Sequence, residues 1–180
     1  MEFQTLLESR RSVREYNEDK KITKDEIKEI IRAAQLAPSW KNRQTSRYHI
    51  VMDEKALAAF RVAGLPSFNA KNAAGASALI VTTFVKDIVG FNEETHEPMN
   101  EAGNGWGYYD LGLQNMALLL KAEEMGFSTL VMGIRHGDKI RGLLSIPEDE
   151  LIASVIAVGY SDAEPEARPR KDVDEIVKFY

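Results

Sequence analysis

The chain has 180 residues, a length typical of one domain, with 44% hydrophobic and 28% charged residues and a mean hydropathy of −0.31. This composition excludes disordered, collagen-like and low-complexity chains, and the absence of cysteine excludes disulfides, thiolate metal ligands and a cysteine nucleophile. The net charge of −5 disfavours nucleic acid or an anionic membrane as the main partner, and neither a signal-peptide pattern nor a membrane-length apolar stretch is present. We therefore expect a cytoplasmic protein without a nucleic-acid or membrane partner.

The first part of the chain is predicted to form two helices. Residues 3–7 have the apolar spacing of a short amphipathic helix. Thr23 and Glu26 have the spacing of a capping box, and isoleucines follow on one helical face. Because a proline disfavours helical geometry in the residue before it, Pro38 should end this second helix near residue 37.

The middle of the chain alternates strands and helices. Residues 48–52 are a strand candidate, and residues 54–62 are a helix candidate closed by Gly64. Residues 78–85 are β-branched and almost continuously apolar, which is typical of a strand buried on both faces. Residues 86–104 read as a long polar loop, and loops of that length are often functional.

The last third contains the longest predicted helix, over residues 107–125. It is apolar over more than one stripe, which favours a place at the centre of the molecule or of a dimer. Two buried strands are predicted at residues 129–132 and 152–158, with a short helix at 138–144 between them. Four strands separated by helices indicate an α/β or α+β domain.

The first polar cluster is the string from Arg10 to Arg14, which holds three arginines and Ser12 at the end of a short helix. Guanidinium groups present forked donors suited to a phosphate or to the oxygens of an electron-rich heterocycle. A solvated run of charge is the alternative interpretation.

The second polar cluster follows the helix that Pro38 ends. Ser39, Asn42 and Gln44 place several hydrogen-bonding side chains on one irregular loop. A plain helix-to-strand connection is the alternative, but such a connection has little need of all these polar groups.

Most common catalytic motifs are absent from the sequence. There is no phosphate-binding P-loop and no nucleophile elbow, and His49, His96 and His136 lack the spacing of metal ligands, so we expect no metal. The glycines of residues 103–107 superficially resemble a dinucleotide-binding loop. They follow a polar loop rather than a strand, and bulky Trp106 would block a pyrophosphate, so a flexible helix entry is the favoured interpretation.

Considered together, these motifs resemble the nitroreductase family of FMN-dependent oxidoreductases, and the resemblance covers nearly the whole chain. It implies one nitroreductase-like FMN-binding domain over residues 1–180. The expected fold is α+β, with a central, mostly antiparallel sheet flanked by helices and a homodimer built on the long central helix. The motifs that carry the resemblance are, in order, Arg10-Arg-Ser-Val-Arg14, Pro38-Ser-x-x-Asn-x-Gln44, Phe68-Asn69, the helix with Asp110, Met132-Gly133 and Arg168-Pro-Arg170.

The resemblance also implies which residues bind FMN. Contacts to the phosphate, the ribityl chain and the pyrimidine side would come from Arg10, Arg11, Ser12 and Arg14, with Arg168 and Arg170 completing the phosphate site. The flavin of the partner subunit would be reached by Pro38, Ser39, Asn42 and Gln44. The pyrimidine edge would be bound by Asn69, and one face of the ring would be lined by Met132, Gly133 and Ile134.

The implied activity is transfer of hydride from NAD(P)H to FMN and on to a nitroaromatic, quinone or similar small-molecule acceptor by ping-pong turnover. No side chain is assigned as catalytic, because the flavin carries the redox chemistry. The alternatives are ene reduction or reductive dehalogenation on the same scaffold, an FMN-binding protein without NAD(P)H-dependent turnover, and a domain that binds no cofactor.

Three aromatic residues are candidates for binding the acceptor. Trp40, Trp106 and Tyr108 could stack on a planar molecule, and the loop over residues 86–104 would contribute to acceptor choice. For Trp106 and Tyr108, packing at a dimer interface is the alternative interpretation.

Overall fold

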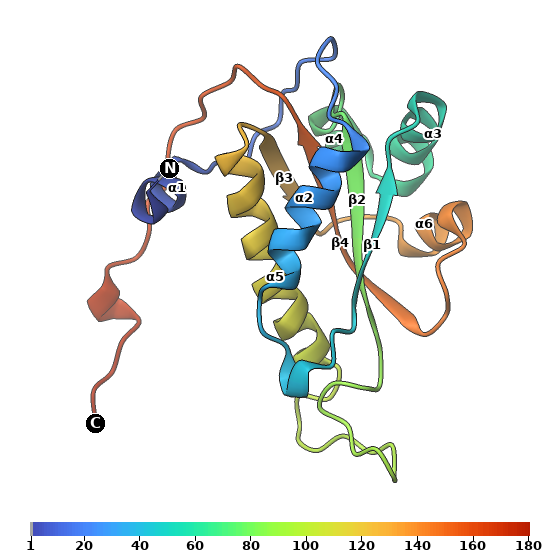
Figure 1. The fold of residues 1–180 in the computed structure, drawn as a ribbon, viewed down its shortest axis with the longest axis vertical. Helices are drawn as coiled ribbons and strands as arrows, with labels where there is room; N and C mark the ends of the chain where they lie inside the picture. Colours follow the sequence, from blue (N-terminus) through green and yellow to red (C-terminus); the bar gives the residue numbers. More distant parts are fainter. Residues whose placement is uncertain (1) are drawn as a thin grey trace.

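Four strands form one antiparallel sheet in the order β1-β2-β4-β3 in the computed structural model, which describes residues 2–180 (Figure 1). The strands are β1 (Ser46–Val51), β2 (Ala78–Val85), β3 (Ser128–Met132) and β4 (Glu150–Gly159). The α-helices are α1 (Phe3–Ser9), α2 (Lys24–Gln35), α3 (Glu54–Gly64), α4 (Ser67–Asn72), α5 (Gly105–Glu124) and α6 (Gly137–Leu144). Two short 3₁₀ helices, η1 (Trp40–Asn42) and η2 (Val173–Glu175), lie outside the sheet.

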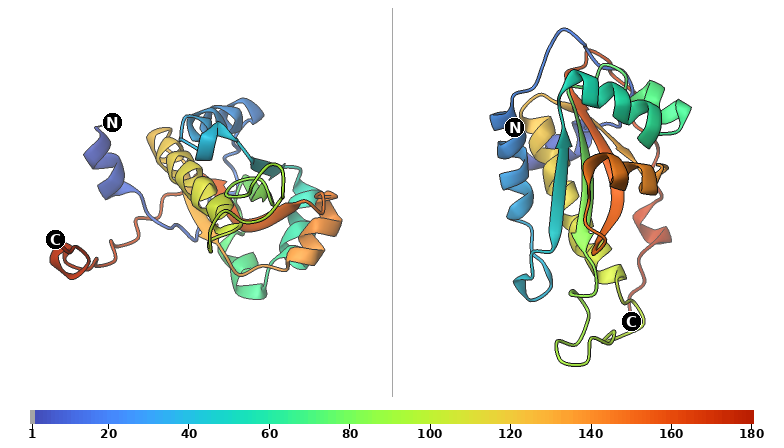
Figure 2. Two further views of the ribbon diagram at one scale, coloured as in Figure 1. Left: turned by 90° about the horizontal axis from the view of Figure 1, so that it is seen from below. Right: turned by 90° about the vertical axis from the view of Figure 1, so that its right-hand side faces the viewer.

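The sheet is covered by helices on both faces (Figure 2). On one face, α2 and α5 pack through Ile30, Leu118 and their neighbours against the strands. On the other face, α3 and α6 contribute Phe60 and Ile140 to a second core. The central strand β2 is buried along almost its whole length, which explains its continuous apolar sequence.

Local sequence signals explain where several elements begin and end. The capping box at the start of α2 is present, since Thr23 Oγ1 accepts from the Glu26 N–H and the Glu26 carboxylate accepts from the Thr23 N–H. The long helix α5 ends before Gly126, whose φ of 79° favours glycine. The expected α+β fold with an antiparallel sheet is therefore confirmed, although the helix α4 was not predicted.

A close approach joins α5 to the central strand. A Cβ on Gly107 would lie 2.2 Å from the Phe84 ring, and Phe84 is buried. Because no side chain fits there, Gly107 lets the first turns of α5 lie directly against β2. These turns carry Trp106, Tyr109 and Asp110.

The two ends of the chain extend away from the sheet. The helix α1 lies apart from the sheet, and the segment after β4 runs past α1 to the C-terminus (Figures 1 and 2). Apolar side chains in this last segment are exposed, among them Val173, Ile176 and Phe179. Such exposure is unusual for a free segment and is typical of a surface that packs against another chain.

A buried polar cluster links three strands. The Glu150 Oε2 atom lies 2.7 Å from His49 Nε2 and also accepts from the Thr83 hydroxyl. Burial by itself acts to raise the pKa of Glu150, but the hydrogen bonds from Thr83 and His49 and the charges of His49 and Arg47 hold this pKa below its ordinary value. Folding therefore favours the ionised carboxylate.

We expect Glu150→Gln to lower the free energy of unfolding by about 2 kcal/mol at pH 7, because a buried charge-assisted hydrogen bond is lost. The native carboxylate binds a proton less tightly than the unfolded one, so its contribution is complete above about pH 5 and is lost as the pH falls further. Urea unfolding from pH 7 down to pH 3 measures this. Glu148→Gln, at an exposed position, is the control. If the difference in unfolding free energy between the wild type and Glu150→Gln stayed constant down to pH 3, the stabilising role of the Glu150 carboxylate would be contradicted.

Candidate functional site

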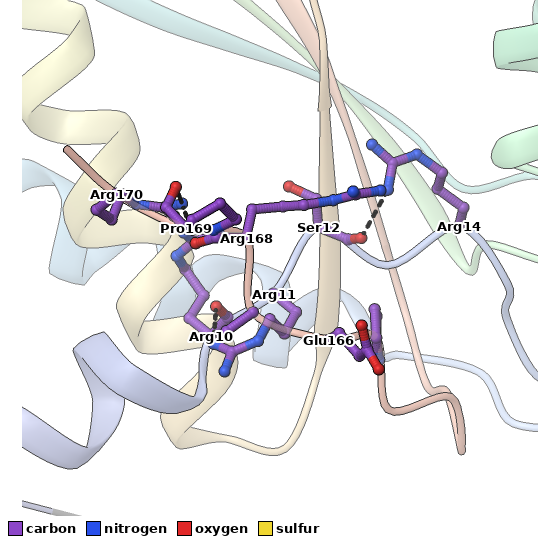
Figure 3. Close-up of a pocket in the computed structure, with 10 residues that line it drawn as sticks. Arg10, Arg11, Ser12, Arg14, Glu166, Arg168, Pro169 and Arg170 are labelled. Carbon is purple, nitrogen blue, oxygen red and sulfur yellow. Dashed lines mark hydrogen bonds between the residues drawn. The ribbon is translucent and has the colours of Figure 1, made fainter.

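An arginine-lined cavity of about 470 Å³ lies between two segments that are far apart in the sequence (Figure 3). One segment follows α1 and the other follows β4, and they face each other across the cavity. The sequence-predicted residues that line it are Arg10, Arg11, Ser12, Arg14, Arg168 and Arg170. The structure thus brings together the two predicted arginine clusters.

The first segment is held in place by the edge strand β3. Ser12 forms a parallel bridge with Thr129, and the Val13 N–H donates to the Thr129 carbonyl over 2.9 Å. Val13 is buried, whereas Ser12 and Arg14 on either side are exposed. The extended backbone therefore directs alternate side chains to opposite sides.

The positive charge of the cavity is not balanced by ion pairs. Within residues 2–180, none of the five arginines that line it forms a salt bridge with a carboxylate. Arg14 Nη1 and Arg170 Nη1 donate only to nearby carbonyls, at 3.1 and 2.8 Å, and the buried Nε of Arg10 has no hydrogen-bond partner. Such a concentration of donors is suited to an anion with several oxygens.

Four lining residues were not predicted as site residues, namely Pro165, Glu166, Ala167 and Pro169, and of these only Glu166 is charged. Glu166 contributes a carboxylate to the rim of the cavity, within an acidic stretch that the sequence analysis did not assign. No local signal distinguishes Glu166 from neighbouring acidic residues, because its place follows from the path of the chain after β4. The negative charge of Glu166 repels an anion, so the positive charge of the five arginines must be what favours anion binding in the cavity.

A second predicted group lies at the end of β3. Asn69 of α4 is buried, and its Nδ2 donates to the Ile134 carbonyl over 2.8 Å. Gly133 and Ile134 are exposed. The Met132 side chain belongs to the core, so only its backbone is placed to border a bound ring.

The predicted loop from Pro38 to Gln44 has an unusual backbone. Lys41, Asn42 and Gln44 have φ values of 48°, 56° and 51°, all in the left-handed region. The loop is closed internally by the Gln44 N–H, which donates to Ser39 Oγ over 3.1 Å. It is also joined to α5, because the Trp40 N–H donates to Asp110 Oδ2 over 2.9 Å.

Within one chain this loop does not meet the arginine cavity. Trp40 contacts the first turns of α5, whereas Ser12 bridges to Thr129, just beyond the end of that helix. The 20 residues of α5 span about 30 Å at 1.5 Å per residue. The arginine cavity therefore lies far from Pro38, Ser39, Asn42 and Gln44 of the same chain.

The predicted aromatic residues cluster at the start of α5. The rings of Trp40 and Trp106 meet edge-on with centroids 4.6 Å apart, and Tyr109 contacts Trp106 at 5.7 Å. Trp106 Nε1 donates to Asn100 Oδ1 over 2.9 Å, so Trp106 helps to hold the 86–104 loop. Tyr108 packs on Phe84 and is half-exposed, and Tyr109, which the sequence analysis did not select, is more exposed than either tryptophan.

The described part of the chain has neither a metal-binding cluster nor a membrane-length helix. In residues 2–180, no group of three or more His, Asp or Glu side chains could hold a metal ion. Over the same part of the chain, no helix is long and apolar enough to cross a membrane.

The chain is thus an α+β protein whose sheet has helices on both faces, with an arginine-lined cavity suited to an anion beside the edge strand. A sequence model of the Nitroreductase family matches residues 7–160, and the chain belongs to this family. A protein of Streptococcus pyogenes serotype M6, provisionally named an NAD(P)H nitroreductase, is 26% identical over 99% of both chains. An Archaeoglobus fulgidus protein, provisionally named an NADH dehydrogenase/NAD(P)H nitroreductase, is 28% identical over 95% of this chain and 94% of its own.

Solved structures show the same fold. The nitroreductase family protein from Streptococcus pneumoniae TIGR4 superposes with a TM-score of 0.84 at 21% identity, covering 99% of this chain and 100% of its own. A protein from Exiguobacterium sibiricum 255-15, provisionally described as a nitroreductase and solved in complex with FMN, gives a TM-score of 0.82 at 22% identity over 100% and 98% of the two chains.

Proposed function

We propose that this protein is an FMN-dependent oxidoreductase that uses NAD(P)H to reduce a nitroaromatic, quinone or similar small molecule by ping-pong turnover. The observation that carries the proposal is the cavity in which Arg10, Arg11 and Arg14 meet Arg168 and Arg170. Membership of the nitroreductase family supports it, as do the relatives' provisional names and the FMN bound in one structural neighbour.

The chemistry of the cavity fits the phosphate of FMN. A phosphate dianion offers three acceptor oxygens, and the cavity offers guanidinium donors from two chain segments, one with a buried Nε that lacks a partner. Ser12 adds a hydroxyl. Because the segments belong to the two ends of the chain, residues 1–180 would act as one FMN-binding domain.

The remaining predicted residues would orient the cofactor and the substrates. When bound, FMN supplies the acceptance and release of hydride. Asn69 would bind the pyrimidine edge, Gly133, Ile134 and the Met132 backbone would border one face of the ring, and an arginine near the pyrimidine oxygen would stabilise negative charge there. Trp40, Trp106 and Tyr108 would border a planar acceptor.

The pocket would be completed by a second copy of the chain. The face of α5 that includes Tyr109, Leu113 and Met116 is exposed, although these side chains are apolar or aromatic. A homodimer through this face would bury them and could bring the loop from Pro38 to Gln44 to the flavin of the partner subunit.

The purified protein is expected to be yellow and to release one FMN per chain on denaturation. It should oxidise NADPH or NADH with a quinone as acceptor, and initial rates at varied concentrations of both substrates should give the parallel double-reciprocal lines of ping-pong turnover. Absorption spectra and stopped-flow reduction measure these properties. A colourless protein that gains no flavin absorbance with added FMN would refute the cofactor, and bound FMN without NAD(P)H oxidation would leave only a flavin-binding protein.

A further inference from the structure

Asp110 is a buried carboxylate that the proposed function does not use. It lies on α5, one turn after Trp106, and its side chain is 3% exposed. Burial raises the pKa of the Asp110 carboxyl above its ordinary value, and the hydrogen bond from the Trp40 N–H opposes this shift. An acidic group at such a position costs folding free energy, which a hydrophobic residue would avoid.

Asp110 contacts the loop from Pro38 to Gln44, and the intrinsic backbone preferences of the loop residues do not explain its conformation. Lys41, Asn42 and Gln44 all adopt left-handed backbone conformations, which are unfavourable for most residues other than glycine. The bonds inside the loop, such as Asn42 N–H to the Ser39 carbonyl at 2.9 Å, shape the loop but do not fix its place on the protein. That place must come from contacts with other elements.

Two of these contacts come from one face of α5. Trp106 and Asp110 are four residues apart, so they lie on the same side of the helix. The Trp106 ring packs against the ring of Trp40, while the Asp110 carboxylate accepts a hydrogen bond from the Trp40 main-chain N–H. A third contact, the ion pair between Arg43 and Glu93, lies at the surface and is expected to contribute little.

We propose that Asp110 is a positioning residue: by binding the Trp40 N–H it sets the place of the loop from Pro38 to Gln44 and thereby the affinity for FMN in the pocket that this loop completes. The part that concerns FMN rests on the proposed function. The part that concerns the loop does not.

The first test follows the loop without flavin. The chain has two tryptophans, so Trp106→Phe leaves Trp40 as the single fluorophore. In this background Asp110→Ala should increase acrylamide quenching of Trp40 at least twofold, because the loop loses its main-chain contact. Asp110→Asn keeps an acceptor oxygen and should restore the parent value.

Gln114→Ala is the matched control. Gln114 lies one turn further along α5, is also buried, and accepts from the Tyr48 hydroxyl over 3.1 Å rather than from the loop. Its loss should lower the thermal midpoint as a general defect of α5 would, but leave Trp40 quenching unchanged. Equal quenching in Gln114→Ala and Asp110→Ala would overturn the proposal.

The second test measures FMN affinity in the otherwise unchanged chain. Losing the hydrogen bond that positions the loop should weaken FMN binding about tenfold in Asp110→Ala, whereas Asp110→Asn, which keeps an acceptor oxygen for the Trp40 N–H, should have wild-type affinity. Unchanged affinity in Asp110→Ala, or equal losses in both variants, would overturn the proposal. Failure of the wild type to bind FMN would instead refute the proposed function, and the quenching test would still decide the positioning of the loop.

Should Asp110→Ala not fold, the donor can be removed instead. Trp40→Pro deletes the N–H at the first position of a 3₁₀ helix, where proline is tolerated, and Ser39 already has the extended backbone that precedes proline. Trp40→Ala keeps the N–H and removes the same ring. FMN binding about tenfold weaker in Trp40→Pro than in Trp40→Ala supports the proposal, and equal binding contradicts it.

Discussion

FMN binding is expected to weaken more than a hundredfold when Arg168 and Arg170 are both replaced by alanine. Each replacement removes a guanidinium from the cavity, and two charge-assisted contacts are together worth on the order of 3 kcal/mol. Fluorescence titration of the apoprotein with FMN measures the change. The effect should be much larger than the change of about 0.5 kcal/mol or less that is usual for surface substitutions.

Two controls separate a phosphate site from other causes. Riboflavin lacks the phosphate, so its weaker binding should hardly respond to the double substitution. Lys171→Ala with Lys178→Ala removes two exposed positive charges from the same segment without touching the cavity lining, and should leave FMN binding nearly unchanged. Equal losses for FMN and riboflavin would reject the phosphate role and indicate a folding defect.

Replacing Leu113 and Met116 with glutamate is expected to convert the proposed dimer into monomers of about 20 kDa that no longer retain FMN. Both side chains lie on the exposed face of α5, and burying two unpaired carboxylates in an interface costs several kcal/mol, or more than a thousandfold in the dimer dissociation constant. Sedimentation velocity and the flavin content of each species measure the two effects.

The matched control places two glutamates on the opposite face of the sheet. Val62 of α3 and Leu143 of α6 are also exposed and apolar, but they lie far from the α5 face. Val62→Glu with Leu143→Glu should remain a dimer that retains FMN. A wild-type monomer that binds FMN, or a dimer that survives the substitutions on α5, would show that the pocket does not need a second copy.

The local elements of the fold were predictable because each depends on neighbouring residues. The apolar β-branched run of β2 and the capping box before α2 were recognisable from spacing alone, and both are present. The short helix α4 was missed, since its six residues include no apolar repeat and it begins after Pro66 without a side-chain cap. The pattern of four strands separated by helices was also compatible with an α/β fold, and only the antiparallel pairing of the strands identifies the fold as α+β.

The residue types of the candidate site and their order can be read from the chain without a structure, which is why the family could be recognised from arginine clusters, a polar loop and a long apolar helix. Which of these residues meet in space depends on the packing of the sheet and helices. The arginines near residues 10 and 170 share one cavity because the extended segment at Ser12 pairs with the edge of β3. Asp110 meets Trp40 because Gly107 lets α5 lie against β2, and the loop after Pro38 is separated from the arginines by the length of that helix. These contacts join residues distant in the sequence, and no local pattern encodes the distance between them.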